Sequence, residues 1–259
     1  MGACTKAFER LNIEFEIADY VEIDKFAVAS YNAIHGTHFQ PQDIRNWNKD
    51  IEVDFIMHGS PCQDFSIAGK QKGGDENSGT RSSLMYETLR IVEKLKPKYV
   101  VWENVKNVIS ERHKHNFYNY LNRMENLGYR NSYDLLNAMD FGIPQNRVRM
   151  FVVSVRKDLD FEFVFPQKKE LNICLKDLLE DKADNKFFLT DEQINLLKTH
   201  NVKDDCLHIK NATKKGFLEA HEGDSVFLSF PNSTTRRARV GNSISHTLQT
   251  LCTIGVVVK

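Results

Sequence analysis

The 259-residue sequence lacks a long apolar run, a secretory signal and a net charge. No segment approaches the roughly 18 apolar residues that a membrane-spanning helix needs, and the N-terminus lacks the basic and then apolar profile of a signal peptide. Lysine and arginine total 35, as do aspartate and glutamate, which argues against a generic polyanion binder. These absences predict a soluble cytoplasmic protein with no membrane partner.

Cysteine is also scarce and widely spaced. The five cysteines are an odd number, and no two of them form the Cys-x-x-Cys spacing typical of a zinc site or a redox dithiol. Each cysteine therefore has to be explained singly, and the spacing predicts no metal site. The hydrophobic residues, at 41%, are enough to supply a core for one large α/β domain and a smaller appendage.

Short apolar runs alternate with segments of helical periodicity in the first part of the chain, which is the pattern of βαβ units. Strands are expected at residues 15–21, from residue 53 and from residue 99. Helices are expected at residues 5–11, 25–34, 83–95 and 117–127. Parallel strands with helical crossovers, as in a Rossmann-like α/β sheet, are the most economical arrangement.

A different pattern follows the last of these helices. Two strand-like runs, 132–138 and 148–155, are joined by a segment whose Gly and Pro indicate a turn, so an antiparallel hairpin at the sheet edge is expected. Apolar periodicity then weakens, which predicts a large domain over residues 1–165 and a small irregular region over residues 166–259. Residues 71–83, rich in Gly and Ser, are expected to form a mobile loop.

Cys62 is the first candidate for chemistry. It lies just past the end of the strand expected from residue 53, at the edge where open parallel sheets bind ligands. A thiol is an effective nucleophile near neutral pH, because a useful fraction of it ionises. A lone cysteine is more often a buried structural residue. Gly59, Pro61 and their polar neighbours, however, indicate a tight exposed turn, which is a poor place for a core thiol.

Glu103 and Asn104 end the next parallel strand, at the same edge of the sheet as Cys62. Such a pair taken alone is more often a helix cap or a hydrogen-bonding pair. A nucleophile and a carboxyl group that converge on one cleft suit attack on an electron-poor ring, because the acid neutralises the developing charge. Arg147 and Arg149 alternate along a strand, so they share a face that fits a bound anion or base edge, although strand arginines commonly form surface ion pairs.

Three motifs occur in order: Gly-Ser-Pro-Cys-Gln at 59–63, Glu-Asn-Val at 103–105 and Gln-Asn-Arg-Val-Arg at 145–149. They resemble signature motifs of cytosine-5 DNA methyltransferases of the bacterial and phage restriction-modification type, which transfer a methyl group from S-adenosylmethionine to carbon 5 of cytosine. The resemblance implies a catalytic methyltransferase domain over residues 1–165, a target-recognition region over residues 166–259, and double-stranded DNA as the substrate.

The resemblance also assigns roles to the catalytic candidates. Cys62 would add to carbon 6 of a cytosine flipped out of the helix, Glu103 would stabilise the protonated ring nitrogen 3, and Arg149 would hold the ring oxygen. Arg147 would help to frame the pocket. Flipping is required because a base inside a duplex cannot be reached, and the extrusion costs a few kcal/mol. The Gly- and Ser-rich loop after Cys62 would close over the flipped base.

S-adenosylmethionine is the cofactor that the resemblance implies. Glu22 would bind the ribose hydroxyls, as acids at this strand end do in nucleotide-binding folds, and Ile23 would pack against the adenine. Asp43 and Ile44 resemble the pair at the adenine edge, although an isolated Asp43 would equally be a helix cap or a solvated acid. The remaining cofactor candidates are Pro61 and Leu84 on the methionine side and Gly2 as the last glycine of the cofactor turn.

The C-terminal part is mildly basic, and residues 236–257 resemble the end of a target-recognition region. The expected DNA contacts are Lys214, Lys215, Arg236, Arg237 and Arg239, together with Gln63 and Ser66 beside the nucleophile. Arginine suits guanine edges, whereas charged surface loops that do not line a DNA cleft are usually just solvated.

The sequence differs from the family pattern at both ends. The first and usually central strand is absent before Gly2, and the final Gly-Asn-Ser helix is absent after the target-recognition region, although residues 241–243 imitate its motif. Alternatives to an active enzyme are therefore an inactive DNA-binding remnant or one part of a split methyltransferase that a second polypeptide completes. Methylation of transfer RNA is a further alternative, and a cognate restriction endonuclease is an expected partner.

Overall fold

The computed structural model describes residues 2–62, 65, 74–76, 78–199, 206–248 and 253–258. Two compact units can be distinguished: one comprises Met1–Leu135 and Arg149–Phe165, and the other comprises Leu136–Val148 and Pro166–Lys259. The second unit therefore includes a segment, Leu136–Val148, that we expected in the first. Among the described residues, no helix is long and apolar enough to span a bilayer.

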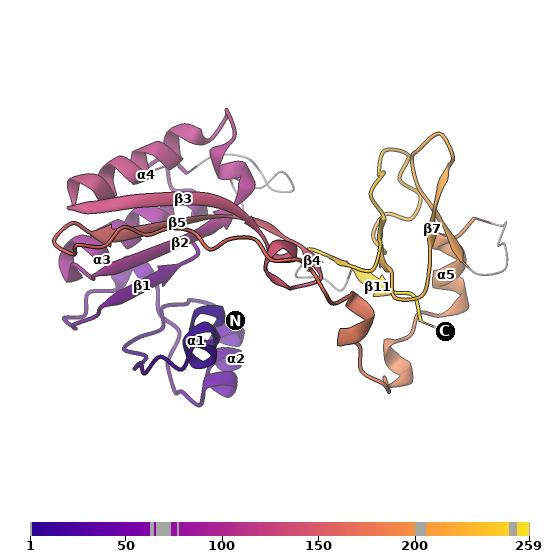
Figure 1. The fold of residues 1–259 in the computed structure, drawn as a ribbon, viewed down its shortest axis with the longest axis horizontal. Coiled ribbons are helices and arrows are strands. Elements are labelled where there is room, and N and C mark those ends of the chain that lie inside the picture. Colours follow the sequence, from indigo (N-terminus) through magenta and orange to yellow (C-terminus); the bar gives the residue numbers. More distant parts are fainter. Residues whose placement is uncertain are drawn as a thin grey trace. The chain divides into compact units, whose positions relative to one another are not determined.

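A four-stranded sheet in the order β1-β2-β5-β3 forms the centre of the first unit (Figure 1). β1 (Phe55–His58) and β2 (Tyr99–Val105) are parallel, and β5 (Val148–Arg156) runs antiparallel to β2. β3 (Tyr129–Asn137) occupies the edge next to β5. The sheet confirms the predicted α/β class, with a parallel pair and an edge hairpin, and it places the ends of β1 and β2 side by side.

Two helices pack into the same core as this sheet. α3 (Met85–Leu95) connects β1 to β2, and α4 (Lys114–Asn126) connects β2 to β3. Met85, Leu89 and Val92 recur at intervals of four and three residues, so one face of α3 is buried. The helix that connects the two parallel strands is therefore buried along the apolar period that the sequence already displays.

The other helical elements of the first unit lie before β1, directly before α3 and directly after β2. They are α1 (Ala3–Arg10), α2 (Lys25–His35) and the 3-10 turns η1 (Ile44–Asn46), η2 (Arg81–Leu84) and η3 (Lys106–Ile109). The predicted helices are confirmed, with slightly different ends. The loop expected at residues 71–83 lies partly outside the described residues, and its last part forms η2.

The prediction of a strand at residues 15–21 is wrong, because this segment has no regular secondary structure. A strand exists only where its backbone groups form a ladder with a neighbour, and no described segment pairs with it in this way. Its aromatic residues pack on helices instead: the Phe15 ring lies 5.5 Å from that of Phe8, and Tyr20 stacks on Tyr31 at 3.8 Å. The apolar residues that suggested a strand therefore serve side-chain packing.

Asp19 ties this segment to the chain that follows α2. Its buried carboxylate, 7% exposed, accepts hydrogen bonds from the Trp47 indole at 2.6 Å and from the Gln42 amide at 2.8 Å. The Lys49 ammonium lies 2.8 Å away. Burial alone would raise the pKa of the Asp19 carboxyl, but the donors around it outweigh burial and hold the pKa below its usual value.

Asp19→Asn is expected to lower the free energy of unfolding by about 1–3 kcal/mol at neutral pH, because buried donors lose a charged acceptor. A folded-state pKa below the unfolded value gives stability that is present above the ordinary carboxyl pKa of about 4 and is lost as the pH falls. The difference between wild type and Asp19→Asn should therefore shrink in acid.

Urea titrations at several pH values, followed by tryptophan fluorescence, measure this difference. Asp54→Asn is the matched control, since the Asp54 side chain is 75% exposed and its ion pair with Lys98 contributes little. An equal loss from both variants, or a loss that does not depend on pH, would contradict the account.

The second unit consists of small sheets, short helices and turns. β4 (Gln145–Asn146) pairs with β10 (Ser245–His246), which explains why the tip of the β3–β5 hairpin belongs here. The other elements are β6 (Leu207–Lys210) paired with β7 (Phe217–Ala220), the sheet of β11 (Ile254–Val256), β8 (Ser225–Phe227) and β9 (Val240–Gly241), α5 (Asp191–Leu197), and the turns η4 (Ala138–Phe141), η5 (Leu175–Leu178) and η6 (Asn185–Phe187). Target recognition stays a prediction for this unit.

Candidate active site

Cys62 lies in a turn that begins where β1 ends, and its thiol is free and partly exposed. The turn is held by two buried side chains of β2. The Trp102 indole donates to Ser60 Oγ at 3.0 Å, and the Asn104 amide donates to the Ser60 carbonyl at 3.2 Å. Because Trp102 and Asn104 are each only 1% exposed, the core of the first unit fixes the backbone that carries the thiol.

Glu103 faces this turn from the opposite side of β2. Side chains alternate along a strand, so Glu103 points away from its two buried neighbours. A Cβ added at Gly59 would lie 3.4 Å from Glu103 Oε2, so the carboxylate lies close to the Gly59 end of the turn. Glu103 Oε1 lies 3.0 Å from Arg149 Nε on the adjacent β5. The structure thus brings the Cys62 turn, Glu103 and Arg149 to one edge of the sheet.

The ion pair between Glu103 and Arg149 is partly exposed, with side-chain exposures of 26% and 18%. Such pairs contribute modestly to stability because water screens them. Their position matters more for chemistry, since the carboxyl group and the fork of N–H donors lie near the turn that leads to Cys62. The roles of nucleophile, acid and hydrogen-bond donor expected for Cys62, Glu103 and Arg149 stay predictions.

Buried residues that support the site are not evident from the sequence. His58 ends β1, and its Nε2 lies 2.9 Å from the Tyr120 hydroxyl, while its ring lies parallel to that of Trp102. Burial lowers the pKa of His58 to about 3, so the imidazole is neutral and acts as a packing and hydrogen-bonding group. The continuous apolar run from Tyr99 to Trp102 at the start of β2 gives no signal that singles out Trp102.

Arg147 belongs to the second unit. Its backbone N–H donates to Asn137 Oδ1 at 2.9 Å, and its carbonyl accepts a hydrogen bond from the Ala138 N–H at 3.1 Å. These bonds fix the entry to β5. The role of Arg147 in framing a base pocket stays a prediction.

The residues expected around the adenosine lie together. The Gln42 N–H donates to the Glu22 carbonyl at 2.8 Å, which joins the segment of Glu22 and Ile23 to that of Asp43 and Ile44. Ile23 is 63% exposed, so its side chain is accessible to a ligand, and its expected packing against the adenine stays a prediction. Asp43 also caps η1, accepting from the Arg45 N–H at 3.0 Å, so the helix-cap alternative describes part of its role.

The other cofactor candidates flank this region. Gly2 has φ +68° at the start of α1, and a Cβ there would lie 2.0 Å from His35 Nε2, so only glycine allows this close approach. The Pro61 carbonyl accepts a hydrogen bond from the Ser82 hydroxyl at 2.7 Å, two residues before Leu84. The close approach at Gly2 is to the His35 ring, and the contribution of these residues to a cofactor site stays a prediction.

The basic residues expected at DNA have different surroundings. Lys214 and Arg237 are exposed. Lys215 pairs with Glu219 at 2.8 Å, and the Arg236 guanidinium lies over the Phe227 ring at 4.1 Å. Gln63 and Ser66 lie outside the described residues. Gly241 ends β9, residues 242 and 243 lie between β9 and β10, and this segment begins no helix.

Arg239 is fully buried, which is contrary to the exposed position expected of a DNA contact. Its guanidinium donates to the carbonyls of Phe227 at 3.2 Å and Ser229 at 3.1 Å, and it also donates to the Phe230 carbonyl. Phe230 itself is 69% exposed and has φ +55°. Arg239 therefore holds a loop in shape, and we expect it to position that loop without touching DNA.

Arg239→Met is expected to speed amide exchange in residues 226–241, because three carbonyls lose their donor. A loss of about 1–3 kcal/mol corresponds to exchange roughly 5- to 150-fold faster. Hydrogen exchange followed by mass spectrometry measures the change. Arg237→Met, two residues away on the surface, should leave exchange unaltered, and equal effects of the two substitutions would argue against the positioning role.

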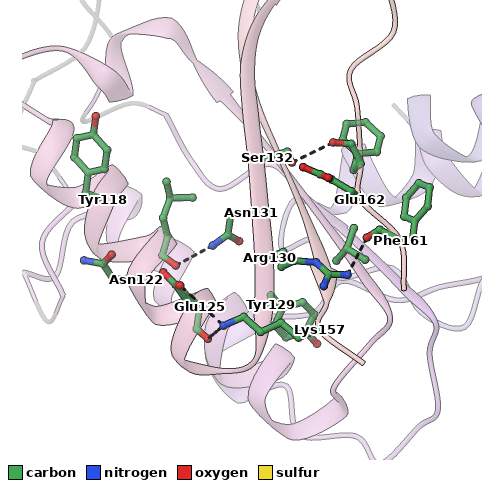
Figure 2. Close-up of a pocket in the computed structure, with 13 residues that line it drawn as sticks. Tyr118, Asn122, Glu125, Tyr129, Arg130, Asn131, Ser132, Lys157, Phe161 and Glu162 are labelled. Atoms are coloured by element: carbon green, nitrogen blue, oxygen red, sulfur yellow. Dashed lines mark hydrogen bonds and ion pairs between the residues drawn. The ribbon is translucent and has the colours of Figure 1, made fainter. Parts of the chain in front are cut away.

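A pocket of about 450 Å³ lies elsewhere in the first unit, between α4, β3 and the chain after β5 (Figure 2). Its polar groups bond to the surrounding chain: Asn131 donates to the Leu121 carbonyl at 3.1 Å, and Ser132 donates to the Phe163 carbonyl at 3.2 Å. No residue predicted for catalysis, cofactor or DNA lines this pocket. It is therefore a packing groove of the sheet, separate from the Cys62 edge.

The fold and the site define an α/β domain of the cytosine-5 methyltransferase class. A solved structure of a DNMT2 mutant from Spodoptera frugiperda shares the fold, with a TM-score of 0.62 at 20% identity over 76% of this chain and 63% of that chain. Residues 1–249 match the family described as C-5 cytosine-specific DNA methylase, so the chain belongs to this family.

Curated relatives include enzymes named as type II methyltransferases. M2.ScrFI of Lactococcus lactis subsp. cremoris is 48% identical over 155 residues, which is 59% of this chain and 43% of the relative. M.HhaI of Haemophilus parahaemolyticus is 41% identical over 162 residues, or 61% of this chain and 48% of the relative. The chain spans about half the length of these relatives.

Proposed function

We propose that this chain carries the cytosine-attacking site of a DNA (cytosine-5) methyltransferase, with Cys62 as the nucleophile. The observation that supports the proposal most directly is that Glu103, which is paired with Arg149, lies close to Gly59 in the turn that leads to Cys62. Family membership supplies the class of reaction. The geometry supports the division of roles among the three side chains.

Cys62 attacks as the thiolate, so that its Sγ forms a bond to carbon 6 of a flipped-out cytosine and the ring electrons shift towards carbon 5. Glu103 shares a proton with ring nitrogen 3 and so offsets the charge that develops there. Arg149 donates to the ring oxygen. After carbon 5 has gained a methyl group, loss of its proton to a base restores the double bond and breaks the bond to Cys62.

S-adenosylmethionine supplies the electrophilic methyl group when it is bound. Glu22, Ile23, Asp43 and Ile44 would hold its adenosine part, and Pro61, Leu84 and Gly2 would line its amino acid part. Glu22 accepts from the Asp24 N–H at 2.9 Å, which orients the carboxylate for a ribose hydroxyl. These residues would therefore orient the methyl donor.

Transfer of a labelled methyl group from S-adenosylmethionine to duplex DNA by the purified chain tests the proposal. Cys62→Ser is expected to reduce transfer at least about a thousandfold, because a covalent nucleophile is lost. Glu103→Gln is expected to reduce transfer about 10²- to 10⁴-fold, the usual contribution of a general acid. Cys174→Ser, a partly exposed cysteine far along the chain, is the matched control and should retain activity.

The assay is run on the chain alone, with a second methyltransferase polypeptide added, and with transfer RNA in place of DNA. Transfer only after addition of the second polypeptide would support a split enzyme built on the same Cys62 site. Retained transfer by Cys62→Ser would refute the nucleophile. Absence of transfer in every arm would favour an inactive DNA-binding remnant, and methylation of transfer RNA alone would replace the proposed substrate.

We also propose that Lys214, Arg236 and Arg237 contact the phosphates of double-stranded DNA. Each phosphate contact that is removed lowers the slope of log affinity against log salt concentration by about 0.9. Lys214→Ala and Arg237→Ala should each reduce both the affinity and the salt slope, as fluorescence anisotropy with labelled duplex would show.

Lys186→Ala is the control for the phosphate contacts, because Lys186 is an exposed lysine paired with Asp184 in the same unit. An unchanged salt slope in the Lys214→Ala and Arg237→Ala proteins would refute these contacts. A cognate restriction endonuclease remains a proposed partner, since the relatives are named type II methyltransferases. The proposed DNA substrate agrees with the cytoplasmic location expected from the sequence.

A further inference from the structure

One face of the β6–β7 hairpin carries an unusual set of side chains. In its antiparallel register Leu207 lies opposite Ala220, and His208 lies opposite Glu219. Side chains alternate between the faces of a strand. Ala220 is fully buried, so Leu207 and Ala220 point to the core of the second unit and the other face carries His208 and Glu219.

Cys206 and His221 continue the same register by one residue beyond the two strands, so they lie opposite each other on the face of His208 and Glu219. The thiol of Cys206, a carboxylate oxygen of Glu219 and a ring nitrogen of His221 all lie within 4.8 Å of one another. Donor atoms of a tetrahedral zinc site are separated by about 3.4–3.8 Å, given bonds of about 2.0–2.3 Å. Small side-chain rotations would therefore let the three donors share one ion.

His208 provides a second and independent observation. Only 8% of this residue is exposed, and its Nδ1 has no hydrogen-bond partner among the described residues. Its ring stacks on that of Phe217 at 4.1 Å, which fixes the imidazole plane. Buried imidazole nitrogens are normally satisfied, so this one is expected to have a polar partner, and the strand register places it on the same face as the three donors.

We propose that Cys206, Glu219 and His221 bind a zinc ion at the base of the β6–β7 hairpin. Thiolate, imidazole and carboxylate are the donors that zinc prefers, and the mixture of sulfur and nitrogen disfavours magnesium and calcium. The Cys206 thiol releases its proton to solvent when the Zn–S bond forms. A fourth position is open to water or to a neighbouring side chain.

Glu219 forms an ion pair with the exposed Lys215 ammonium at 2.8 Å, and this pair competes with metal binding. An exposed ion pair of this kind contributes little, so a divalent ion with a thiolate and an imidazole displaces it. The benefit is structural, because the only described core cluster of the second unit is small, and small scaffolds gain stability from a metal that joins two strands.

Cobalt(II) titration of the purified chain tests the site, since cobalt replaces zinc and its bond to a thiolate produces charge-transfer absorption in the near ultraviolet. Wild-type protein is expected to show this absorption with one equivalent of cobalt and to lose it when zinc is added. Cys206→Ser should abolish it. His221→Ala should weaken cobalt binding at least about tenfold, because even residues that only hydrogen-bond to a metal ligand usually contribute about that much to metal affinity.

Cys174→Ser is the matched control, because Cys174 is another free and partly exposed cysteine of the second unit. It should bind cobalt as wild type does. The proposal is overturned if wild-type protein shows no thiolate-to-cobalt absorption, if Cys206→Ser retains it, or if Cys174→Ser also loses it. The readout does not involve methyl transfer, so its outcome is separate from that of the proposed activity.

Discussion

The hydrogen bonds that fix Ser60 are the constraint on which the candidate site depends. Trp102 and Asn104 lie in the core of the first unit, and both donate to Ser60. Cys62 lies two residues further along the same turn, so the packing of the sheet determines where the thiol is held. A preorganised nucleophile needs this kind of support, because small displacements of a reacting group are costly.

Glu103 depends on the same constraint through strand alternation. Its neighbours on β2 point into the core, so Glu103 must point to the turn and to Arg149. The core and the candidate site are therefore two faces of one strand. A substitution that disturbs the buried face of β2 is expected to move the carboxylate as well as the turn.

Strong periodic patterns made much of the fold predictable. The βαβ unit around α3 and the edge hairpin follow from apolar periods that are visible in the sequence. The strand expected at residues 15–21 was wrong because a strand depends on a neighbour, which local composition does not specify. Asp19 and the aromatic rings around Tyr20 organise that segment through contacts distant in sequence.

The site was predictable in part for a similar reason. Strand ends and motifs pointed to Cys62, Glu103 and Arg149, and the structure places the Cys62 turn and the ion pair at one edge. The burial of Arg239 was not predictable, because a basic run looks the same whether its members face solvent or loop carbonyls. The hairpin cluster at Cys206 was missed because hairpin register, and not sequence spacing, brings its members together.

Covalent trapping with duplex DNA that contains 5-fluorocytosine tests the central claim most directly. Carbon 5 of this base carries fluorine in place of hydrogen, so no proton can be lost after methyl transfer and the attacking sulfur stays attached. Incubation with S-adenosylmethionine, alone or with a second methyltransferase polypeptide, should give a stable adduct that peptide mass spectrometry locates at Cys62. An adduct at another cysteine, or an equal yield from Cys62→Ser, would contradict the account.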